Sequence, residues 1–319
     1  MASDNGKTRL SRRSVLSVTG GLLGAAAASA ADAAPPAEAA GRFQGRVAVI
    51  TGGARGMGRS HAVALAREGA TVVACDILEQ ISTISYPLAT QADMDETGRL
   101  VTAAGGRFVG VKTDVRDPKA ADAVVARALE QFGKIDFLLP NAGVYQTSPA
   151  AKMSDQLFDD IVRTNLYGVF HIIRAALPAM TQRKAGRIVA TASQAARMGL
   201  ADTAGYAASK WGVIGLIKSV ALDVAKQGVT VNCVCPTAVN TPLLNNRVAW
   251  SAALPGDPAP TREKFEAKMR LSPYAPQGVP WVEPEDVTAA VLFLLSDEAR
   301  YMTGMAVDVT AGGSAGYMA

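Results

Sequence analysis

Histidine and cysteine are scarce in this chain, and their scarcity excludes most metal sites. Among 319 residues there are two histidines and three cysteines. His61 and His171 are too few for a typical catalytic zinc site, and His171 lies in a helical pattern where packing is expected. Cys75, Cys233 and Cys235 form neither a metal-ligand spacing nor an even-numbered disulfide framework. Each cysteine lies in an apolar strand-like run, so we expect three small buried side chains and no metal.

Long runs of Lys and Arg are also absent. The formal net charge is only +4, and no basic cluster indicates a nucleic-acid groove, so we expect no nucleic-acid partner. With 49% hydrophobic and 19% charged residues, the composition is that of a globular protein with a substantial core. The length allows one large α/β domain or two small ones.

The first 41 residues differ in composition from the rest. Residues 11–16 read Ser-Arg-Arg-Ser-Val-Leu, and an apolar stretch rich in Ala and Gly follows to about residue 30. A basic start, a short apolar middle and small residues near 28–33 are typical of an export signal, and the Arg pair resembles a twin-arginine signal. The apolar stretch is too short and too rich in Gly for a stable membrane span. The alternative is a disordered extension on a cytoplasmic enzyme.

The body, residues 42–319, alternates short β-rich runs with longer helical patterns. Such alternation predicts one Rossmann-type α/β domain, a doubly wound parallel sheet of about seven strands with helices on both faces. The expected strands are 47–50, 70–75, 107–113, 135–139, 188–192, 230–234 and 305–309. The expected helices are 56–68, 117–132, 155–182, 204–226 and 284–296.

Two long irregular stretches interrupt this rhythm, and such stretches are often lids or binding loops. The first, about 77–95, is an insertion where a short loop would suffice. The second, about 239–282, is rich in Pro and Gly and has a helical piece near 261–269. It follows the sixth strand at the edge where open α/β sheets bind ligands. We therefore expect it to form the substrate-loop region.

A glycine-rich turn follows the first strand. Gly52, Gly56 and Gly58 allow a tight turn and a close approach to a pyrophosphate at a helix N-terminus. Their spacing, Gly-x3-Gly-x-Gly, also fits an ordinary strand–helix turn. Asp76 favours the dinucleotide, because it ends the second strand 18 residues past Gly58, where an acidic residue accepts hydrogen bonds from the adenosine ribose.

The same carboxylate discriminates between the two nicotinamide cofactors. Asp76 would repel a 2′-phosphate, so NAD is favoured over NADP. Arg55, inside the glycine turn, would argue for a phosphate, but we weight Asp76 more because its position faces the ribose. The predicted cofactor-binding residues are Gly52, Arg55, Gly56, Met57, Gly58, Asp76, Asp114, Val115, Asn141, Ala142, Gly143, Tyr206, Lys210, Pro236, Val239 and Thr241.

The predicted cofactor-binding residues that come after Asp76 in the sequence mostly follow the ends of strands. Asp114 and Val115 come after the third strand and could cap the adenine edge, although an Asp there also fits a helix start, which Asp117 already supplies. Residues 141–143 end the fourth strand with a small turn that would pass the cofactor. Residues 236–241 end the sixth strand and could cover the nicotinamide.

The acid/base chemistry is predicted from Tyr206 and Lys210. Four residues apart, they lie on one face of a helix, one turn from each other. A nearby ammonium favours the phenolate and would move the tyrosine pKa toward neutrality, where a phenol can act as general acid or base. Ser193 ends the fifth predicted strand with a hydroxyl, thirteen residues upstream of Tyr206.

Taken in order, these motifs resemble the short-chain dehydrogenase/reductase family over about residues 43–319. The glycine turn, residues 141–143, Asn165, Ser193, Tyr206 with Lys210, and the Pro236 segment occur in family order. Thr237 departs from the glycine that many members have there. The insertion with its Tyr-Pro-Leu-Ala-Thr stretch at 86–90, and the segment 236–242, resemble a narrower branch, the mycofactocin-associated or carveol-dehydrogenase-like enzymes.

The resemblance implies roles for four residues. Tyr206 would exchange a proton with the substrate oxygen, while Lys210 would assist its ionisation and hydrogen-bond the nicotinamide ribose. Ser193 would donate to the substrate oxygen, and Asn165 would hold a water that relays protons. In this branch NAD is thought to stay bound, with electrons leaving through a mycofactocin-type carrier. The family usually forms a homotetramer through helices near 155–182 and 204–226 and the last strand.

The sequence thus predicts an NAD-dependent oxidoreductase that interconverts a secondary alcohol and its ketone. One alternative is an ordinary dehydrogenase with exchangeable NAD(P) acting on a 3-oxoacyl thioester or a sugar alcohol. A second is a dinucleotide-binding sensor without turnover. Trp250, Leu254, Phe265 and Met269 suit a terpenoid- or steroid-like alcohol, although they also fit a subunit contact or core packing.

Overall fold

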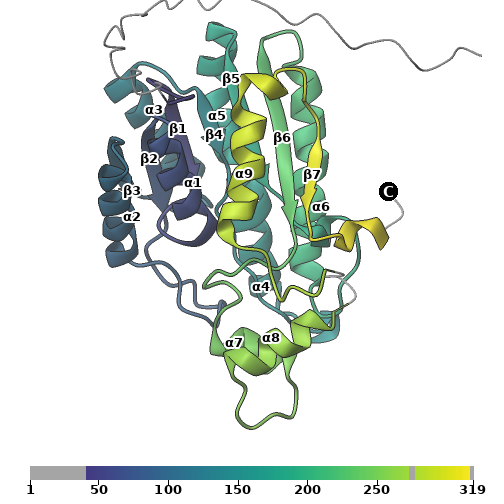
Figure 1. Cartoon of the computed structure of the whole chain (residues 1–319). Helices are drawn as coiled ribbons and strands as arrows, with labels where there is room; N and C mark the ends of the chain where they lie inside the picture. The colour runs from purple at the N-terminus through teal and green to yellow at the C-terminus, as the bar shows by residue number, and fades with distance from the viewer. Residues whose placement is uncertain (1–40, 273–276, 317–319) are drawn as a thin grey trace, which may run out of the picture. The chain divides into compact units, whose positions relative to one another are not determined.

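A computed structural model describes residues 41–272 and 277–316 of the chain. The predicted signal segment therefore lies outside the described residues, except for Gly41. In the described part, seven parallel strands form one sheet in the order β3-β2-β1-β4-β5-β6-β7 (Figure 1). The strands are β1 (Val47–Thr51), β2 (Thr71–Asp76), β3 (Phe108–Lys112), β4 (Phe137–Leu139), β5 (Gly186–Thr191), β6 (Val229–Pro236) and β7 (Ala306–Val309). The predicted doubly wound sheet and its seven strands are confirmed.

Helices cover both faces of this sheet. On one face α1 (Gly56–Arg67) packs between α2 (Gln91–Ala103) and α9 (Pro284–Leu295). On the other lie α3 (Pro118–Phe132), α5 (Gly168–Arg183) and α6 (Ala204–Asp223). Within the described residues, no helix is both long enough and apolar enough to cross a membrane.

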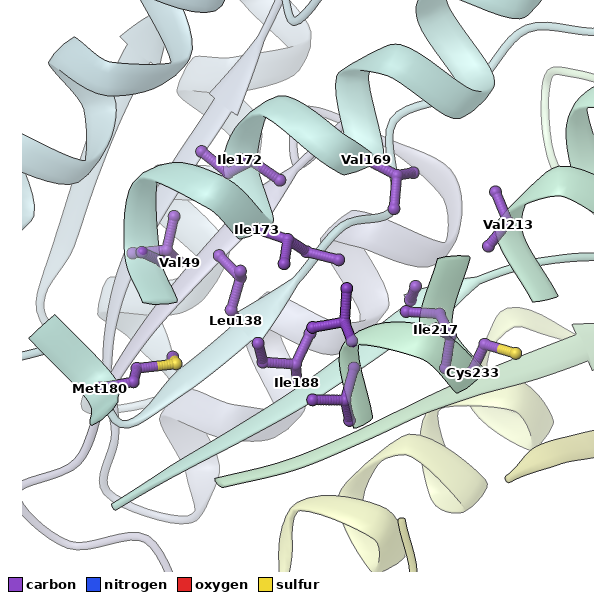
Figure 2. Close-up of a cluster of buried hydrophobic side chains, with 14 of the residues drawn as sticks. Val49, Leu138, Val169, Ile172, Ile173, Met180, Ile188, Val213, Ile217 and Cys233 are labelled. Carbon is purple, nitrogen blue, oxygen red and sulfur yellow. The ribbon is translucent and has the colours of Figure 1, made fainter. Parts of the chain in front are cut away.

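The two layers of core follow from the alternation of side chains along buried strands. In β1, Val49 packs into the core under α3, α5 and α6, whereas Ala48 and Ile50 pack into the core under α1, α2 and α9. Figure 2 shows the first of these cores, where strand residues such as Leu138 and Ile188 meet α5. Because β1 is buried on both faces, its sequence is continuously apolar, as parallel strands usually are.

The structure corrects the predicted extent of the first insertion. The sequence pattern placed an irregular stretch at 77–95 and no helix there, but α2 begins at Gln91. Thr90 starts this helix through a capping box: its hydroxyl accepts from the Asp93 amide, and the Asp93 carboxylate accepts from the Thr90 amide. The irregular part is therefore residues 77–90, which we call the strap.

The predicted single helix 155–182 is also divided. It consists of α4 (Asp155–Val162), a π-helical turn η2 (Arg163–Tyr167) and α5. Wider turns of this kind are frequent at functional sites, and η2 contains Asn165. The prediction was wrong on continuity because hydrophobic periodicity does not distinguish a π-turn inside a helix.

The second irregular stretch projects beyond the carboxyl ends of the strands (Figure 1). We call residues 239–282 the lobe. It contains α7 (Arg247–Ala253), which was not predicted, and α8 (Arg262–Arg270), which matches the helical piece expected near 261–269. A single parallel bridge between Val239 and Val282 closes its base. The lobe thus begins and ends at one point on the sheet edge.

Candidate active site

Two neighbouring hollows lie at the carboxyl ends of the strands. The first encloses about 770 Å³ of empty space between the glycine turn, the strap and the end of β4. The second encloses about 520 Å³ between β5, α6 and the start of the lobe. Both are lined by Met57, Asn141, Gly143, Thr241 and Leu243, so they form one continuous cleft.

The glycine turn needs glycine for two reasons: a positive φ angle at Gly52, and close backbone contacts at Gly52 and Gly58 that leave no room for a Cβ. Gly52 has φ +65°, and a Cβ there would lie 2.7 Å from the Ala142 Cα. A Cβ on Gly58 would lie 2.1 Å from the Gly52 carbonyl oxygen. These positions let β1, the loop after β4 and α1 approach one another closely. The turn is therefore compact enough to bring backbone amides to the cleft wall.

The first turn of α1 lacks the capping side chain that several other helices have. Arg55 occupies the N-cap position and makes no capping hydrogen bond, and no acidic residue lies in the first turn. By contrast, Asp117 caps α3 and Ser154 caps α4 through side-chain oxygens. The amides at the start of α1 thus remain available, and a helix N-terminus in this state favours an anion such as a pyrophosphate.

Asp76 lies at the end of β2 on the wall of the first hollow, as predicted. Its carboxylate accepts from the Ala54 amide at 3.1 Å and from the Ile77 amide at 2.9 Å. Burial raises its pKa, and the two amides and the Arg55 charge act in the opposite direction. The Arg55 guanidinium itself donates to the Pro87 carbonyl of the strap at 2.6 Å. It is therefore engaged with protein, which weakens the argument for a 2′-phosphate.

The two residues predicted at the adenine edge lie in different surroundings. Asp114 lines the first hollow, but both of its oxygens pair with Arg116, at 2.9 and 2.8 Å to Oδ2. Val115 does not line the hollow; it packs against Gly168, where a Cβ would lie 2.6 Å from its side chain. The alternative role of helix start belongs to Asp117, as the sequence indicated.

Asn141 ties three strand ends together. Its backbone amide and that of Ala142 both donate to the Thr51 hydroxyl at 3.0 Å. Its side-chain amide donates to the Gly52 carbonyl at 3.2 Å, and its oxygen accepts from the Thr191 hydroxyl at 3.1 Å. Asn141 therefore fixes the floor of the cleft, while Ala142 and Gly143 leave room above it.

Ser193 and Tyr206 meet at the second hollow, which both residues line. The Ser193 hydroxyl accepts from the Ala195 amide at 3.1 Å. Burial raises the pKa of Tyr206, and its hydrogen bond with Ser193 opposes that shift. The predicted lowering of this pKa by Lys210 is therefore not the net result, because desolvation of the phenolate outweighs the stabilising contacts.

Lys210 is almost fully buried beside Tyr206, with its Nζ 5.8 Å from the tyrosine ring centroid. The ammonium donates to the Thr191 carbonyl at 2.8 Å, and burial lowers the Lys210 pKa to about 8. Both Lys210 Nζ and Asn165 Oδ1 lie within 4 Å of a Cβ built on Gly143. The structure therefore brings the predicted catalytic residues to one side of the cleft.

Asn165 is held by the loop that follows β4. Its Oδ1 accepts from the Val144 amide at 2.8 Å, and its Nδ2 donates to the Val144 carbonyl at 2.9 Å. The same Nδ2 donates to the Ser209 hydroxyl at 3.2 Å. The π-turn therefore positions this side chain to anchor residues 143–145 against α6.

The strap crosses the first hollow and is fastened on both sides. On one side Pro87 accepts from Arg55 of the glycine turn. On the other, the Thr83 hydroxyl donates to the Asp160 carboxylate of α4 at 2.8 Å, and the Ser85 hydroxyl donates to the Gln146 oxygen at 2.7 Å. Its apolar residues form a separate buried cluster with Val144, Ile161, Leu157, Leu243 and Tyr206, to which it contributes Ile77, Ile81, Ile84, Tyr86 and Leu88.

The apolar lining of the second hollow differs from the prediction. Its lobe residues are Val239, Thr241, Leu243 and Leu244, next to Pro236 and Thr237 at the end of β6. None of the four residues expected to favour a bulky alcohol, Trp250, Leu254, Phe265 and Met269, lines either hollow. Phe265 instead stacks on Trp281 with ring centroids 5.9 Å apart. The Phe265 side chain thus stabilises the lobe itself.

Several contributors to the site carried no recognisable spacing. Tyr145 contacts Tyr206 with ring centroids 4.9 Å apart, and Tyr86 accepts from the Tyr145 amide at 3.2 Å. Gln80 organises the strap by donating to the carbonyls of Ile84 and Tyr86. The sequence signal for Tyr86 was its place in a resembling insertion, which gave no role to its hydroxyl. No pattern pointed to Tyr145 or Gln80.

Groups that could bind a metal are dispersed in this part of the chain. Among residues 41–272 and 277–316, no three His, Cys, Asp or Glu side chains gather in a way that could hold an ion. Cys75, Cys233 and Cys235 are free and buried, which confirms their predicted packing role. His171 contacts the Val115 carbonyl oxygen at 3.0 Å through Nδ1.

Comparison with known proteins agrees with this geometry. A family model described as short chain dehydrogenase matches residues 46–252. The (−)-trans-carveol dehydrogenase of Rhodococcus erythropolis is 40% identical over 273 residues, which cover 85% of this chain and 98% of that protein. The levodione reductase of Leifsonia aquatica is 32% identical over 86% of this chain and 97% of its own length.

A solved structure gives the same result. The crystal structure of carveol dehydrogenase from Mycobacterium avium in complex with NAD matches with a TM-score of 0.83 and 38% identity, covering 86% of this chain and 99% of that one. The chain therefore belongs to the short-chain dehydrogenase family. This membership confirms the predicted carveol-dehydrogenase-like branch and the oxidoreductase class. The NAD in that relative agrees with the predicted cofactor.

Proposed function

We propose that this short-chain dehydrogenase interconverts a secondary alcohol and its ketone, with Tyr206 as the general acid/base. The observation that carries the proposal is the placement of Ser193, Tyr206 and Lys210 around a hollow that opens into the glycine-turn cleft. The glycine turn would hold the pyrophosphate of NAD, and residues 236–241 would hold its nicotinamide beside Tyr206, so that hydride and proton transfer would act on the same substrate carbon–oxygen bond. Bound NAD supplies the hydride chemistry.

The protein groups divide the remaining work. In alcohol oxidation Tyr206, in its phenolate form, would accept the hydroxyl proton, and Ser193 would donate a hydrogen bond to the same oxygen. The Lys210 ammonium stabilises the phenolate electrostatically; with a pKa of about 8 it is predominantly charged at neutral pH. Proton loss to solvent would pass by a water near Lys210 and Asn165, because Lys210 Nζ and Asn165 Oδ1 both lie within 4 Å of a Cβ built on Gly143. Each such proton-transfer group contributes roughly 10²- to 10⁴-fold in rate.

The proposal includes an NAD that stays bound through successive turnovers and is reoxidised by a mycofactocin-type carrier. Its support is the strap, which runs over the hollow from Arg55 to α4 and is fastened by hydrogen bonds at both sides. A cofactor beneath it would leave only when these contacts open. The alternative is an NAD that exchanges in every cycle while the strap serves another purpose.

NAD content of the purified full chain tests this choice. After extensive dialysis the protein is denatured, and the supernatant is analysed by absorbance and mass spectrometry. We expect about one NAD per chain, with turnover visible with artificial electron acceptors. A protein that arrives empty and reduces added NAD would instead be an ordinary dehydrogenase.

Removing the strap sharpens the same test. Replacement of residues 78–89 by a short Gly-Ser linker spares Asp76 and the Thr90 cap of α2. We expect the variant to exchange NAD freely while the sheet remains folded. Unchanged NAD retention in the variant would contradict a trapping role for the strap.

The substrate panel follows from the relatives and from the lining. Two relatives are named for carveol and levodione, so these compounds are tested first. Leu243 and Leu244 give the second hollow an apolar wall, which favours such substrates over a sugar alcohol. A 3-oxoacyl thioester and a sugar alcohol complete the panel. Absence of turnover on every compound, with NAD bound, would favour the dinucleotide sensor.

The assembly we propose is a homotetramer. Large apolar side chains are exposed on α4, η2, α5 and α6: Phe158, Tyr167, Phe170 and Trp211 are 41–54% exposed. Apolar patches of this kind mark interaction surfaces. Light scattering measures the mass directly, and Trp211→Arg should dissociate the assembly. A monomeric parent would contradict the proposal.

We also propose export of the folded enzyme through the twin-arginine route, supported by the Arg pair at residues 12–13. Replacement of both arginines by lysine should retain the protein in the cytoplasmic fraction. Equal distribution of parent and variant would favour a cytoplasmic enzyme with an N-terminal extension.

A further inference from the structure

We infer that the strap also positions the acid/base tyrosine, with Tyr86 and Tyr145 as positioning residues for Tyr206. This inference rests on the proposed role of Tyr206 in proton transfer. It adds a second task to the strap, since holding a cofactor would require no contact with the catalytic side chain. The structure shows a continuous line of contacts from the strap to that side chain.

The first contact is between two rings. Tyr145, in the loop after β4, meets Tyr206 edge to face, with ring centroids 4.9 Å apart and an interplanar angle of 89°. This is a favoured geometry for aromatic pairs. The rigid ring of Tyr145 removes alternative orientations from Tyr206 and keeps water from that side. A fixed phenol is what efficient proton transfer requires, because small misplacements of reacting groups are costly.

The second contact connects Tyr145 to the strap. The Tyr145 amide donates to the Tyr86 hydroxyl oxygen at 3.2 Å. Tyr86 is 4% exposed, and its own carbonyl accepts from Gln80 at 3.2 Å. The next residue in the loop, Gln146, accepts from both the amide and the hydroxyl of Ser85. The strap therefore grips the loop on two successive residues.

The electrostatic surroundings suit a single titrating phenol. Tyr206 is faced by Lys210 on its own helix, Cys235 on β6, Tyr145 on the loop and Tyr86 on the strap. Burial raises the pKa of both Tyr86 and Tyr145 to about 12. They remain neutral where the enzyme works, so they add no competing negative charge. Their contribution is shape and exclusion of water.

Tyrosine ring labelling tests the inference on the full chain. The sequence has only seven tyrosines, so ring ¹³C labelling gives a readable spectrum, and Tyr206→Phe assigns the Tyr206 signal. We expect Tyr86→Phe and Tyr145→Leu to shift or broaden that signal, because the neighbouring ring moves or is lost. Tyr145→Phe keeps the ring and should largely restore it. Tyr301→Phe, at an 87% exposed position, is the control.

Turnover of the same variants gives the functional result. With NAD content equal to that of the parent, kcat should fall on the order of tenfold in Tyr86→Phe and Tyr145→Leu while KM stays unchanged. In Tyr145→Leu the pKa that Tyr206 sets in the pH profile of kcat should move downward. Water would reach Tyr206 and weaken the effect of burial, which raises its pKa. Tyr145→Phe should recover most of the rate.

The outcomes separate the two proposals. An active parent whose Tyr206 signal, or whose kcat, is unaffected by Tyr86→Phe and Tyr145→Leu would overturn the positioning role alone. A parent without turnover on any alcohol or ketone would overturn the proposed function, and the positioning role with it. Loss of NAD together with the loss of rate would assign the strap a cofactor role only and would also overturn the inference.

Discussion

The strap and the lobe both interrupt the same parallel sheet, yet they are built in opposite ways. The strap buries Ile81, Ile84, Tyr86 and Leu88 in a cluster shared with the catalytic side. In the lobe, α7 buries none of its residues and α8 buries only Phe265. The strap is thus part of the folded body, whereas the two lobe helices bury little, and Phe265 of α8 stacks on Trp281 within the lobe.

Their attachments differ in the same direction. The strap is held by hydrogen bonds to the glycine turn, to α4 and to the loop after β4. The Val239–Val282 bridge closes the base of the lobe, and the Asn240 amide donates to the Val282 carbonyl at 3.0 Å. Of the described lobe residues, Leu243 packs against the strap cluster. Regions with few buried contacts open most easily. We therefore propose that the strap retains the cofactor and positions Tyr206, and that the lobe admits the substrate.

The largest effect should come from the residue that the strap supports. Tyr206→Phe removes the proton-transfer group, so kcat should fall by roughly 10²- to 10⁴-fold. NAD content should remain that of the parent, because the ring still fills the strap cluster. Steady-state kinetics and NAD assay on the same preparation measure both. A variant that keeps the parent's kcat would show that Tyr206 is not the proton-transfer group. The strap would then differ from the lobe without supporting a catalytic residue.

A smaller effect concerns the stability of the frame, which is the sheet with its covering helices, to which the strap and the lobe are attached. His61 Nδ1 on α1 contacts the Thr288 hydroxyl of α9 at 2.7 Å, and burial lowers the His61 pKa from its ordinary value of 6.5 to about 4. Unfolded chains bind the proton first, so its contribution to stability is present above pH 6.5 and is lost as the pH falls toward 4. The loss should reach on the order of 3 kcal/mol.

Denaturant unfolding of the parent and of His61→Gln between pH 7 and pH 4 measures this contribution. The variant should show a flatter dependence of unfolding free energy on pH across that window. Identical slopes would show that another group controls acid sensitivity. Strap and lobe variants are best compared above pH 6.5, where stability does not depend on the protonation of His61.

The frame could be predicted from the sequence better than the regions attached to it. Strands buried on both faces are mostly apolar, so β1 was visible as a continuous apolar run, and the alternation of strands with helices indicated the parallel sheet. Gly52 and Gly58 mark positions where any Cβ would collide with backbone. Such constraints are local and leave a direct trace in the sequence.

The missed features depend on contacts between distant segments. Helix α2 was overlooked because it buries only Met94, Thr97 and Val101, although the Thr90 cap gave a usable start signal. The π-turn at Asn165 and the contact of Tyr145 with Tyr206 arise from tertiary packing. For Trp250, Leu254, Phe265 and Met269 the sequence left a substrate wall, a subunit contact and core packing open, because an apolar set in a loop does not reveal what it packs against.

A point substitution in the strap should have a moderate effect on cofactor release. The Gln80 amide donates to the carbonyls of Ile84 and Tyr86 and accepts from the Leu88 amide. Because Gln80→Ala removes these three hydrogen bonds, each worth about 1 kcal/mol, it should speed NAD loss at least about tenfold. The rate of NAD loss is measured by dialysis against NAD-free buffer with timed sampling. Gln91→Ala, an exposed glutamine on α2 outside the strap, is the matched control and should keep the parent's rate.

The smallest effect should belong to the lobe and should leave the cofactor untouched. Leu244 lines the second hollow, is half-buried and is not part of the strap cluster. Leu244→Ala should raise KM for an apolar alcohol about fivefold, as expected for loss of about 1 kcal/mol of apolar contact. NAD retention should be unchanged, and Leu271→Ala, at an 86% exposed lobe position, should match the parent. If Leu244→Ala instead released NAD with no change in KM, strap and lobe would act as one enclosure and the division of labour between them would be wrong.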